Sequence, residues 1–442
     1  MLSQRPLRRL FDALDYIIDE RVGIVRFVLE VPRQPGSPDF YHFFAQASDT
    51  SAFTAQTNFA KTGGASIRRE TAMAKAAGEA VERYCGAIYD LDDLPLHSYF
   101  TAPFRCVDPG DFALLSPEQY ARPAALFVPF DEDTPIRWTP ALDPVTGETW
   151  HVPAAFVYVP YVYHRGRGES PIGQSISTGL ACHCSYAEAA ISAICEVVER
   201  DAFTITWQAM LAHPQIRIES LSAENRDIVS RFQKAGYDVT LMDMTLDAGI
   251  PTVLAISRGQ ESDTPALVPA GSASLDPEDA IRKSLEELEH TREYCHKIQV
   301  DAGQRDGLPE GEEINDQSGH LRFWCSHEHV HLADFLFRSQ IRKNADEIVN
   351  LSTGDARQDL QRLLTKVGAT GHRVLLSELT TPDVADCGLS VIRAMIPGYH
   401  PLVVGHNLRS LGGERLWTVP QLLGHEGVTR TTGDNPVPHP YP

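Results

Sequence analysis

One short charged phrase occurs twice in this chain, at residues 79–83 and again at residues 196–200. Its pattern is E-x-V-E-R, and both copies follow an Ala-rich stretch. Glutamates three positions apart project from one face of a helix, so each copy predicts a helix face with two carboxylates and an arginine beside them. Any fold of this chain has to accommodate these carboxylates, which limits where the two helices can lie.

Helix start signals accompany both copies. Ser185 and Glu188 form an S-x-x-E capping box ahead of an apolar periodic run, which predicts a helix that continues through Phe203 or beyond. For the first copy, we predict a helix that is opened by residues 63–66, with Ser66 as its N-cap.

A third long helix is expected to begin at Asp276 and Pro277, residue types favoured at the N-cap and the first helical position. It carries Glu286 and Glu289, again three apart, and Arg292 follows. Three helices therefore each offer paired glutamates with a nearby arginine. Such pairs on a single helix are usually solvated faces or weak surface ion pairs. The apolar neighbours and the repeated phrase instead favour helices that are packed on several sides.

Strand signals are mixed with these helices along the whole chain, which favours one large α/β (α+β mixed) domain. The repeated phrase indicates an internal pseudo-repeat of strands and Glu-bearing helices. We divide the chain into an N-terminal entry segment (1–60), a main domain (61–430) and a Pro-rich C-terminal tail (431–442), which is expected to be polyproline II rather than helix. The predicted strands lie within residues 22–31, 137–142, 149–163, 238–245, 252–257, 373–380 and 389–397.

The charge balance excludes some classes of partner. With 39 basic and 59 acidic residues, the formal net charge is −20, which argues against duplex nucleic acid and anionic membranes as partners. The first residues lack the apolar region of a signal peptide, and no apolar run is long enough to span a bilayer. Eight cysteines without regular spacing predict reduced thiols and a cytoplasmic protein.

Clustered carboxylates repel one another and need cations to compensate them. Mg²⁺ prefers carboxylate and phosphate oxygens, and the arginine fork fits phosphate. Glutamates from separate helices with arginines between them therefore predict a metal cage for a triphosphate. The sequence contains neither a P-loop nor a kinase catalytic-loop motif, so an ATP site here would be of another kind.

Three stretches, at residues 71–84, 177–203 and 276–292, resemble the nucleotide-site helices of the YcaO-domain family, and the likeness covers roughly residues 60–410. The ending NPVPHPYP resembles the P-x-P-x-P terminus of azoline-forming cyclodehydratases, the D proteins of thiazole/oxazole-modified peptide biosynthesis. The resemblance implies that residues 61–430 are a YcaO-like ATP-binding catalytic domain. It also implies a reaction that uses ATP and Mg²⁺. A Cys, Ser or Thr of a peptide attacks the preceding backbone carbonyl, the oxygen is phosphorylated, and a thiazoline or oxazoline forms.

The resemblance also implies roles for individual residues. The residues that match the family's Mg²⁺ ligands are Glu79, Glu82, Glu196 and Glu199. Those that match its ATP-binding positions are Glu79, Arg83, Ser192, Glu196, Arg200, Glu289 and Arg292. The tail prolines Pro438, Pro440 and Pro442 match the terminus that orders the active site, so they are the implied catalytic positions.

Two positions depart from the family pattern. The family often has G-K-G before the first helix, where this chain has Gly64, Ala65 and Ser66. A serine commonly precedes the first glutamate by four positions, where this chain has Lys75, which either supplies the missing positive charge or faces solvent.

Other functions remain open, and the resemblance also implies partners. One alternative is a thioamide- or amidine-forming YcaO enzyme, and another is a catalytically silent docking scaffold for a peptide-modifying complex. The implied partners are a ribosomal precursor peptide, an E1-like docking protein that binds its leader, and a flavin dehydrogenase of the same pathway. A homodimer is also expected.

Overall fold

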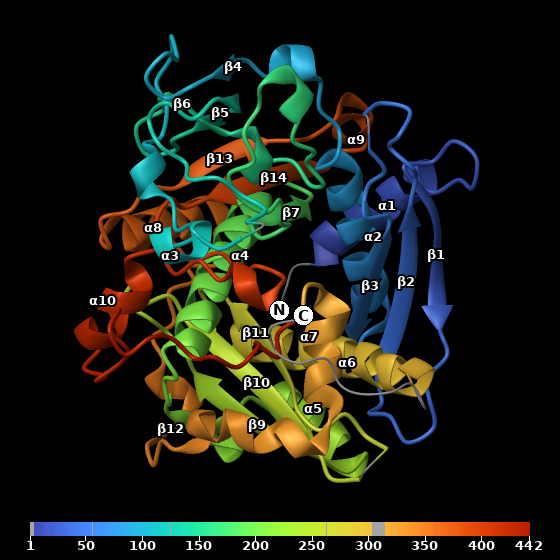
Figure 1. Ribbon diagram of the computed structural model, residues 1–442. Coiled ribbons are helices and arrows are strands. Elements are labelled where there is room, and N and C mark those ends of the chain that lie inside the picture. Colours follow the sequence, from blue (N-terminus) through green and yellow to red (C-terminus); the bar gives the residue numbers. More distant parts are fainter. Residues whose placement is uncertain (1–3, 55, 124, 262, 303–313) are drawn as a thin grey trace.

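The computed structural model describes residues 4–54, 56–123, 125–261, 263–302 and 314–442. Helices and strands are mixed throughout, which confirms the predicted α/β fold class (Figure 1). Residues 302–318 form a polar, Gly-rich stretch that predicts an exposed loop, and they lie largely outside the described residues. The α-helices are α1 (Gln4–Ile17), α2 (Arg69–Cys85), α3 (Pro117–Tyr120), α4 (Tyr186–Gln208), α5 (Ala223–Lys234), α6 (Pro277–Ala302), α7 (Gln317–Cys325), α8 (Ala356–Gly368), α9 (Pro382–Asp386) and α10 (Arg415–Leu422).

The strands form three sheets. The first is antiparallel, in the order β1 (Val25–Val31), β2 (Tyr41–Ala47), β3 (Lys61–Ser66). The second has the order β11 (Val268–Ala273), β10 (Thr252–Gly259), β9 (Tyr237–Asp243), β8 (Gln215–Ile216), β12 (Arg342–Lys343). The third has the order β4 (Leu96–His97), β5 (Ile136–Leu142), β13 (Leu375–Glu378), β14 (Ser390–Met395), β7 (Leu180–His183), with β6 (Thr149–Pro153) paired to β5.

Helix α4 runs through the middle of the molecule, between the second and third sheets (Figure 1). It packs against β14 and β7 on one side and against β11 on the other. Ala189, Ala190 and Ala193 are fully buried, and such small side chains let the strands approach closely. Its start is as predicted, since the Ser185 side chain accepts the Glu188 N–H at 3.3 Å.

Helix α2 covers the first sheet, and α6 packs against β11, β10 and β3. The predicted start of α6 is confirmed, because Asp276 accepts the Glu278 N–H at 2.9 Å. The three Glu-bearing helices therefore reach the centre from different sheets, as Figure 1 shows.

The predicted start of the first helix is wrong. Residues 61–66 form strand β3, and α2 begins at Arg69 without a side-chain cap. A Cβ atom on Gly64 would lie 2.5 Å from the Ala72 carbonyl oxygen, so the glycine allows β3 to lie directly on α2. The Ser66 hydroxyl donates to Glu286 of α6 instead of capping α2.

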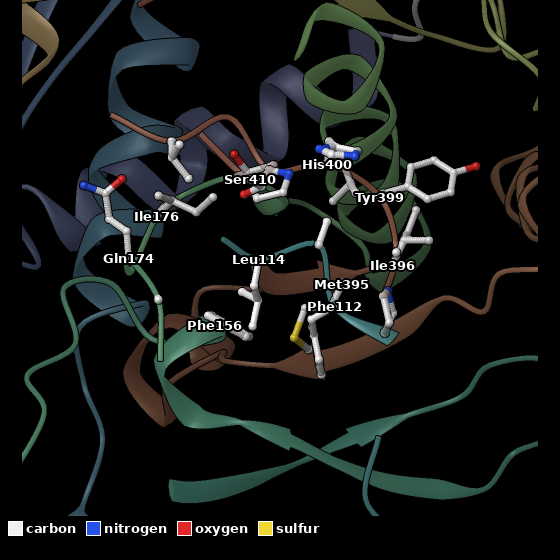
Figure 2. A pocket seen from close by; sticks show the side chains of 18 of the residues that line it. Phe112, Leu114, Phe156, Gln174, Ile176, Met395, Ile396, Tyr399, His400 and Ser410 are labelled. Atoms are coloured by element: carbon white, nitrogen blue, oxygen red, sulfur yellow. The ribbon is translucent and has the colours of Figure 1, made fainter. Parts of the chain in front are cut away.

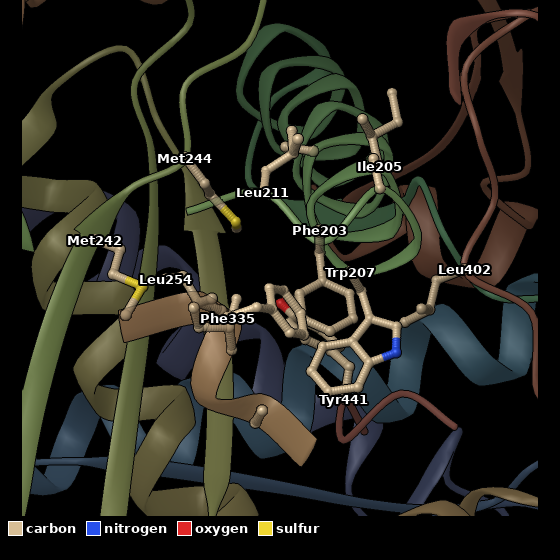
Figure 3. Close-up of a cluster of buried hydrophobic side chains, with 14 of the residues drawn as sticks. Phe203, Ile205, Trp207, Leu211, Met242, Met244, Leu254, Phe335, Leu402 and Tyr441 are labelled. Carbon is tan, nitrogen blue, oxygen red and sulfur yellow. The ribbon is translucent and has the colours of Figure 1, made fainter. Parts of the chain in front are cut away.

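The C-terminal tail is packed into the protein. Residues 433–442 form neither helix nor strand, as predicted for a Pro-rich segment. The indole N–H of Trp207 donates to the Val437 carbonyl at 2.9 Å, and that of Trp324 donates to the Pro438 carbonyl at 2.8 Å. Tyr441 is buried with its ring centroid 4.2 Å from that of Phe203 (Figure 3).

Candidate active site

The first charged phrase lies in the last turns of α2. Arg83 donates to Glu79 at 3.0 Å, and the second oxygen of Glu79 accepts the Gly63 N–H of β3 at 3.4 Å. Glu82 accepts the Cys182 N–H of β7 at 2.8 Å. Both carboxylates of this copy are therefore held by strands that pack on the helix.

The second phrase lies in the middle of α4 and is held differently. Arg200 is 3.5 Å from both Glu196 and Glu199, a looser pairing than in the first copy. The Tyr441 hydroxyl donates to Glu199 at 2.6 Å and accepts the Gly271 N–H at 2.8 Å. The Arg200 guanidinium lies over the Tyr441 ring, 4.8 Å from its centroid. The tail therefore contacts this copy directly.

The two phrases act on each other electrostatically. Burial raises the pKa of Glu82 well above its usual range, and the charges of Glu79 and Glu196 raise it further. Burial likewise raises the pKa of Glu199 to about 7, although Arg200 and the Tyr441 hydroxyl oppose the shift. We call Glu79, Glu82, Glu196 and Glu199 the glutamate cluster. Burial is the largest cause of both shifts, and it disfavours the charged forms of Glu82 and Glu199 unless a cation compensates them.

The third helix brings a different glutamate from those predicted. Glu287 of α6 is 44% exposed and lies 3.5 Å from His290. Burial would raise the pKa of Glu287, but His290, Lys75 and Arg200 hold it at about 2. Lys75 itself is 2.9 Å from Glu286. Lys75 therefore faces α6 rather than open solvent, and it supplies positive charge beside the cluster.

Glu289 and Arg292, the predicted pair on α6, are both buried. They form a two-pronged ion pair at 2.7 and 2.8 Å, and their side chains are 0% and 1% exposed. Arg292 also lies over the Tyr237 ring of β9. By contrast, side chains of the two phrases keep between 11% and 32% of their surface exposed. These are Glu79, Arg83, Glu196, Glu199 and Arg200.

Ser192 lies one turn before Glu196 on α4. Its hydroxyl is 3.0 Å from Nε2 of His183 on β7. Burial lowers the pKa of His183 to about 4, so this histidine is neutral near pH 7. Ser192 is thus on the predicted helix and already has a hydrogen-bonding partner.

The three tail prolines differ in burial. Pro438 and Pro440 are buried and Pro442 is half-buried. The residue that reaches the cluster is Tyr441, which lies between the last two prolines. Sequence reasoning missed Tyr441, Glu287 and His290, although an aromatic residue inside a Pro-rich terminus was an available signal.

The residues present fit ATP and Mg²⁺. Nη1 of Arg200 is buried, lies 3.5 Å from Glu199 and makes no hydrogen bond within the described chain, so it can donate one to a phosphate oxygen. Among the described residues, no three His, Cys, Asp or Glu side chains already form a metal ligand set. Mg²⁺ usually takes one or two carboxylates together with phosphate oxygens, which is the arrangement that the glutamate cluster offers.

Comparison with known sequences assigns the chain to a family. The family model described as YcaO cyclodehydratase, ATP- and Mg²⁺-binding, matches residues 63–400. An uncharacterized protein of Methanothermobacter thermautotrophicus is 29% identical over 358 residues, or 78% of this chain and 85% of that protein. An uncharacterized protein in the tfuA 3′ region of Rhizobium leguminosarum bv. trifolii is 32% identical over 200 residues, or 44% of each.

Solved structures share the fold. A heterocyclase in complex with substrate and cofactor has a TM-score of 0.81 at 21% identity, covering 99% of this chain. This chain spans 57% of that heterocyclase's length. YcaO from Methanopyrus kandleri bound with AMPPCP and Mg²⁺ has a TM-score of 0.64 at 18% identity, covering 90% and 94% of the two chains. The E. coli microcin synthetase McbBCD complex with pro-MccB17 bound gives 0.62 at 14%, covering 93% and 96%.

Proposed function

The chain belongs to the YcaO family, and we propose that it is an ATP-dependent cyclodehydratase that acts on backbone amides of a peptide. The family assignment confirms the prediction of ATP and Mg²⁺ as cofactors. The observation that carries the proposal is the convergence of the two phrases. Two helices from distant parts of the chain place Glu196 close enough to Glu82 to raise its pKa, and Arg200, whose contacts with its own glutamates are 3.5 Å long, lies beside them.

In the proposed reaction, the side chain of a Cys, Ser or Thr in the peptide loses its thiol or hydroxyl proton to solvent as its sulfur or oxygen attacks the preceding carbonyl carbon. The carbonyl oxygen takes the γ-phosphoryl group of ATP, and the oxygen then leaves as phosphate when the ring C=N bond forms. The amide nitrogen loses its proton, and the ring is a thiazoline or oxazoline. Because the nucleophile belongs to the substrate, the protein contributes positioning and electrostatic stabilisation.

We assign the roles as follows. The glutamate cluster holds Mg²⁺, and Arg200 and Arg83 neutralise phosphate oxygens. Ser192 lies beside Glu196 at the nucleotide. On α6, we assign the nucleotide-facing role to Glu287 and His290, because their side chains are partly exposed, whereas Glu289 and Arg292 are buried and bind each other.

The tail prolines are proposed to position Tyr441 rather than to react. Their rigid backbone and the two tryptophan hydrogen bonds hold the tail in one conformation. Tyr441 then fixes Glu199 and shields Arg200.

The proposed substrate is a ribosomal precursor peptide, delivered by an E1-like docking partner, with a flavin dehydrogenase acting later and the chain itself forming a homodimer. We place the reaction in the cytoplasm, and the eight free thiols support this. In the described part of the chain, no helix is long and apolar enough to cross a membrane.

Calorimetric titration of ATP, with and without Mg²⁺, tests the proposal. Wild type and the Glu199→Gln variant are compared with Glu70→Gln, a control on the exposed first turn of α2. We expect Mg²⁺-dependent binding that falls about tenfold or more in Glu199→Gln only, since a charged metal contact is lost. A folded wild-type chain that binds no ATP, alone or with its docking partner, would favour the scaffold alternative.

The masses of Cys- and Ser-containing peptides after incubation with ATP and Mg²⁺ distinguish the enzymatic alternatives. Loss of one water supports cyclodehydration. Exchange of an oxygen for a sulfur, in the presence of a sulfide source, would support thioamide formation instead.

A further inference from the structure

An apolar cavity lies between β14 and the loops that flank it (Figure 2). Its volume is about 120 Å³. For comparison, an apolar cavity of about 150 Å³ lined by Leu, Ile and Phe binds benzene. The cavity therefore has room for one medium-sized apolar group. Among the apolar residues that line it are Phe112, Leu114, Phe156, Ile176, Met395 and Ile396.

The cavity shares a wall with the proposed catalytic site. Val197 of α4 lines the cavity, and the next residue back along the helix is Glu196 of the cluster. Arg393 of β14 also lines the cavity, and its charge interacts with those of Glu196 and Arg83. A molecule that reacts at the cluster can therefore extend into the cavity over a short distance.

Arg393 presents an unused donor here. Its Nε and Nη2 donate to the Phe156 carbonyl at 3.1 and 2.9 Å, and Nη2 also donates to the Ile176 carbonyl at 2.8 Å. The side chain is 3% exposed, and Nη1 has no hydrogen-bond acceptor among the described residues. A buried donor without an acceptor is costly, so this N–H is matched by an acceptor that arrives with a ligand.

We propose that the cavity binds an apolar side chain of the peptide substrate, adjacent to the reacting residue, while Nη1 of Arg393 donates to a backbone carbonyl of that peptide. This inference rests on the proposed function and adds a preference for one flanking residue. A peptide offers both features that the cavity asks for, an apolar group and a carbonyl acceptor close to it.

The adenine ring of ATP is a poorer match. Adenine carries an amino group and several ring nitrogens that need partners, and the cavity's polar groups are mostly occupied. Gln174 both donates to and accepts from the Val404 backbone, at 3.1 and 2.9 Å. His400 accepts the Leu416 N–H through Nε2 at 3.1 Å, and its Nδ1 makes no hydrogen bond within the described chain. The cavity thus offers one cationic donor within an apolar surface, which suits a peptide better than a purine.

The test measures binding of two series of blocked peptides in the presence of Mg²⁺ and a non-hydrolysable ATP analogue. In one series, a variable residue precedes a cysteine, and in the other it follows the cysteine. The variable residue is Leu, Gly or Asp. Burying a leucine side chain supports an expected preference of about tenfold or more for Leu over Gly in one series, with Asp weakest.

Two variants test whether the preference for Leu arises at the cavity. Leu114 is half-buried at the cavity, so Leu114→Trp should fill the space and remove the preference for Leu. Ile218→Trp is the matched control, because Ile218 is also half-buried but packs against a cluster of buried side chains that includes no cavity-lining residue. Affinity for ATP, measured separately, should be the same in both variants as in wild type.

Three results would overturn the inference. They are equal affinity for Leu and Gly peptides in both series, no binding of any peptide by a chain that binds ATP, or a preference that Leu114→Trp leaves intact. Loss of ATP affinity in Leu114→Trp alone would assign the cavity to adenine instead. Absence of ATP binding in wild type would contradict the proposed function itself, so the two failures are distinguishable.

Discussion

The two copies of E-x-V-E-R have different surroundings, although their sequences are nearly the same. On α2, Arg83 binds Glu79 at 3.0 Å, and β7 binds Glu82 through a backbone N–H. On α4, Arg200 stays 3.5 Å from its glutamates, and the tail residue Tyr441 binds Glu199. The first copy is therefore fixed by neighbouring strands, and the second depends on the chain terminus.

This difference indicates which of the two copies is available to a ligand. Arg83 donates a hydrogen bond to Glu79 at 3.0 Å, whereas both contacts of Arg200 with its own glutamates are 3.5 Å long and its buried Nη1 makes no hydrogen bond in the described chain. A phosphate oxygen near α4 would gain a hydrogen bond from a donor that is already desolvated. The second copy is thus the better candidate for direct phosphate contact.

The largest expected effect comes from exchanging each arginine for lysine. Arg200→Lys should weaken Mg²⁺-dependent ATP binding by about tenfold to a hundredfold, since a charged hydrogen bond contributes about 1.5–3 kcal/mol. Arg83→Lys should cost less, because lysine can keep the single contact with Glu79. Calorimetric titration of both folded variants measures the difference, and equal losses would show that the two copies contribute alike.

Much of this arrangement could be predicted from local sequence. The starts of α4 and α6 follow from Ser185 and Asp276, because capping depends on residues within one turn. The repeated phrase correctly indicated two helices with carboxylates on one face. Periodicity and caps are local properties, so a single sequence carries them.

The rest depends on contacts between distant segments. Residues 63–66 contain good helix-opening types, but Gly64 is needed where β3 touches α2, and only the packed sheet reveals this. On α6, Glu286, Glu287 and Glu289 look equivalent in sequence. Strand β3 packs on the helix, and β9 contacts one of its side chains. Such contacts decide which glutamate is buried and which faces the glutamate cluster.

An intermediate effect is expected when the tail loses a single hydroxyl. Tyr441→Phe leaves the Gly271 N–H without its acceptor and Glu199 without a donor, so the free energy of unfolding should fall by about 1–3 kcal/mol. ATP affinity should fall as well, because Glu199 is no longer held. Denaturant titration and calorimetry measure the two quantities.

Tyr84→Phe is the matched control in the first copy's helix. The Tyr84 hydroxyl donates to Asp383 at 3.0 Å, and neither group belongs to the glutamate cluster. This variant should lose stability without losing ATP affinity. If both variants lost affinity to the same extent, the tail would have no special role at the second copy.

The smallest effect near neutral pH concerns His320, which binds the backbone of the tail. His320 donates through Nδ1 to the His439 carbonyl at 2.9 Å and accepts the Gly405 N–H through Nε2 at 3.2 Å, so it must be neutral. Burial lowers the pKa of His320 from 6.5 to about 4, and the nearby charge of Arg409 also lowers it. Its contribution to stability is therefore complete above about pH 6.5 and is lost as the pH falls towards about 4.

Tail anchoring should follow this dependence, because a protonated Nε2 cannot accept the Gly405 N–H. Trp207 and Trp324 both bind the tail backbone, so their fluorescence during denaturant titrations at several pH values reports its packing. We expect the wild-type midpoint to fall more steeply on acidification than that of His320→Asn, whose amide keeps a donor but does not titrate. Midpoints that fall in parallel with pH would mean that His320 is not the titrating group. The contact between the tail and the second copy would then not become acid-sensitive through His320.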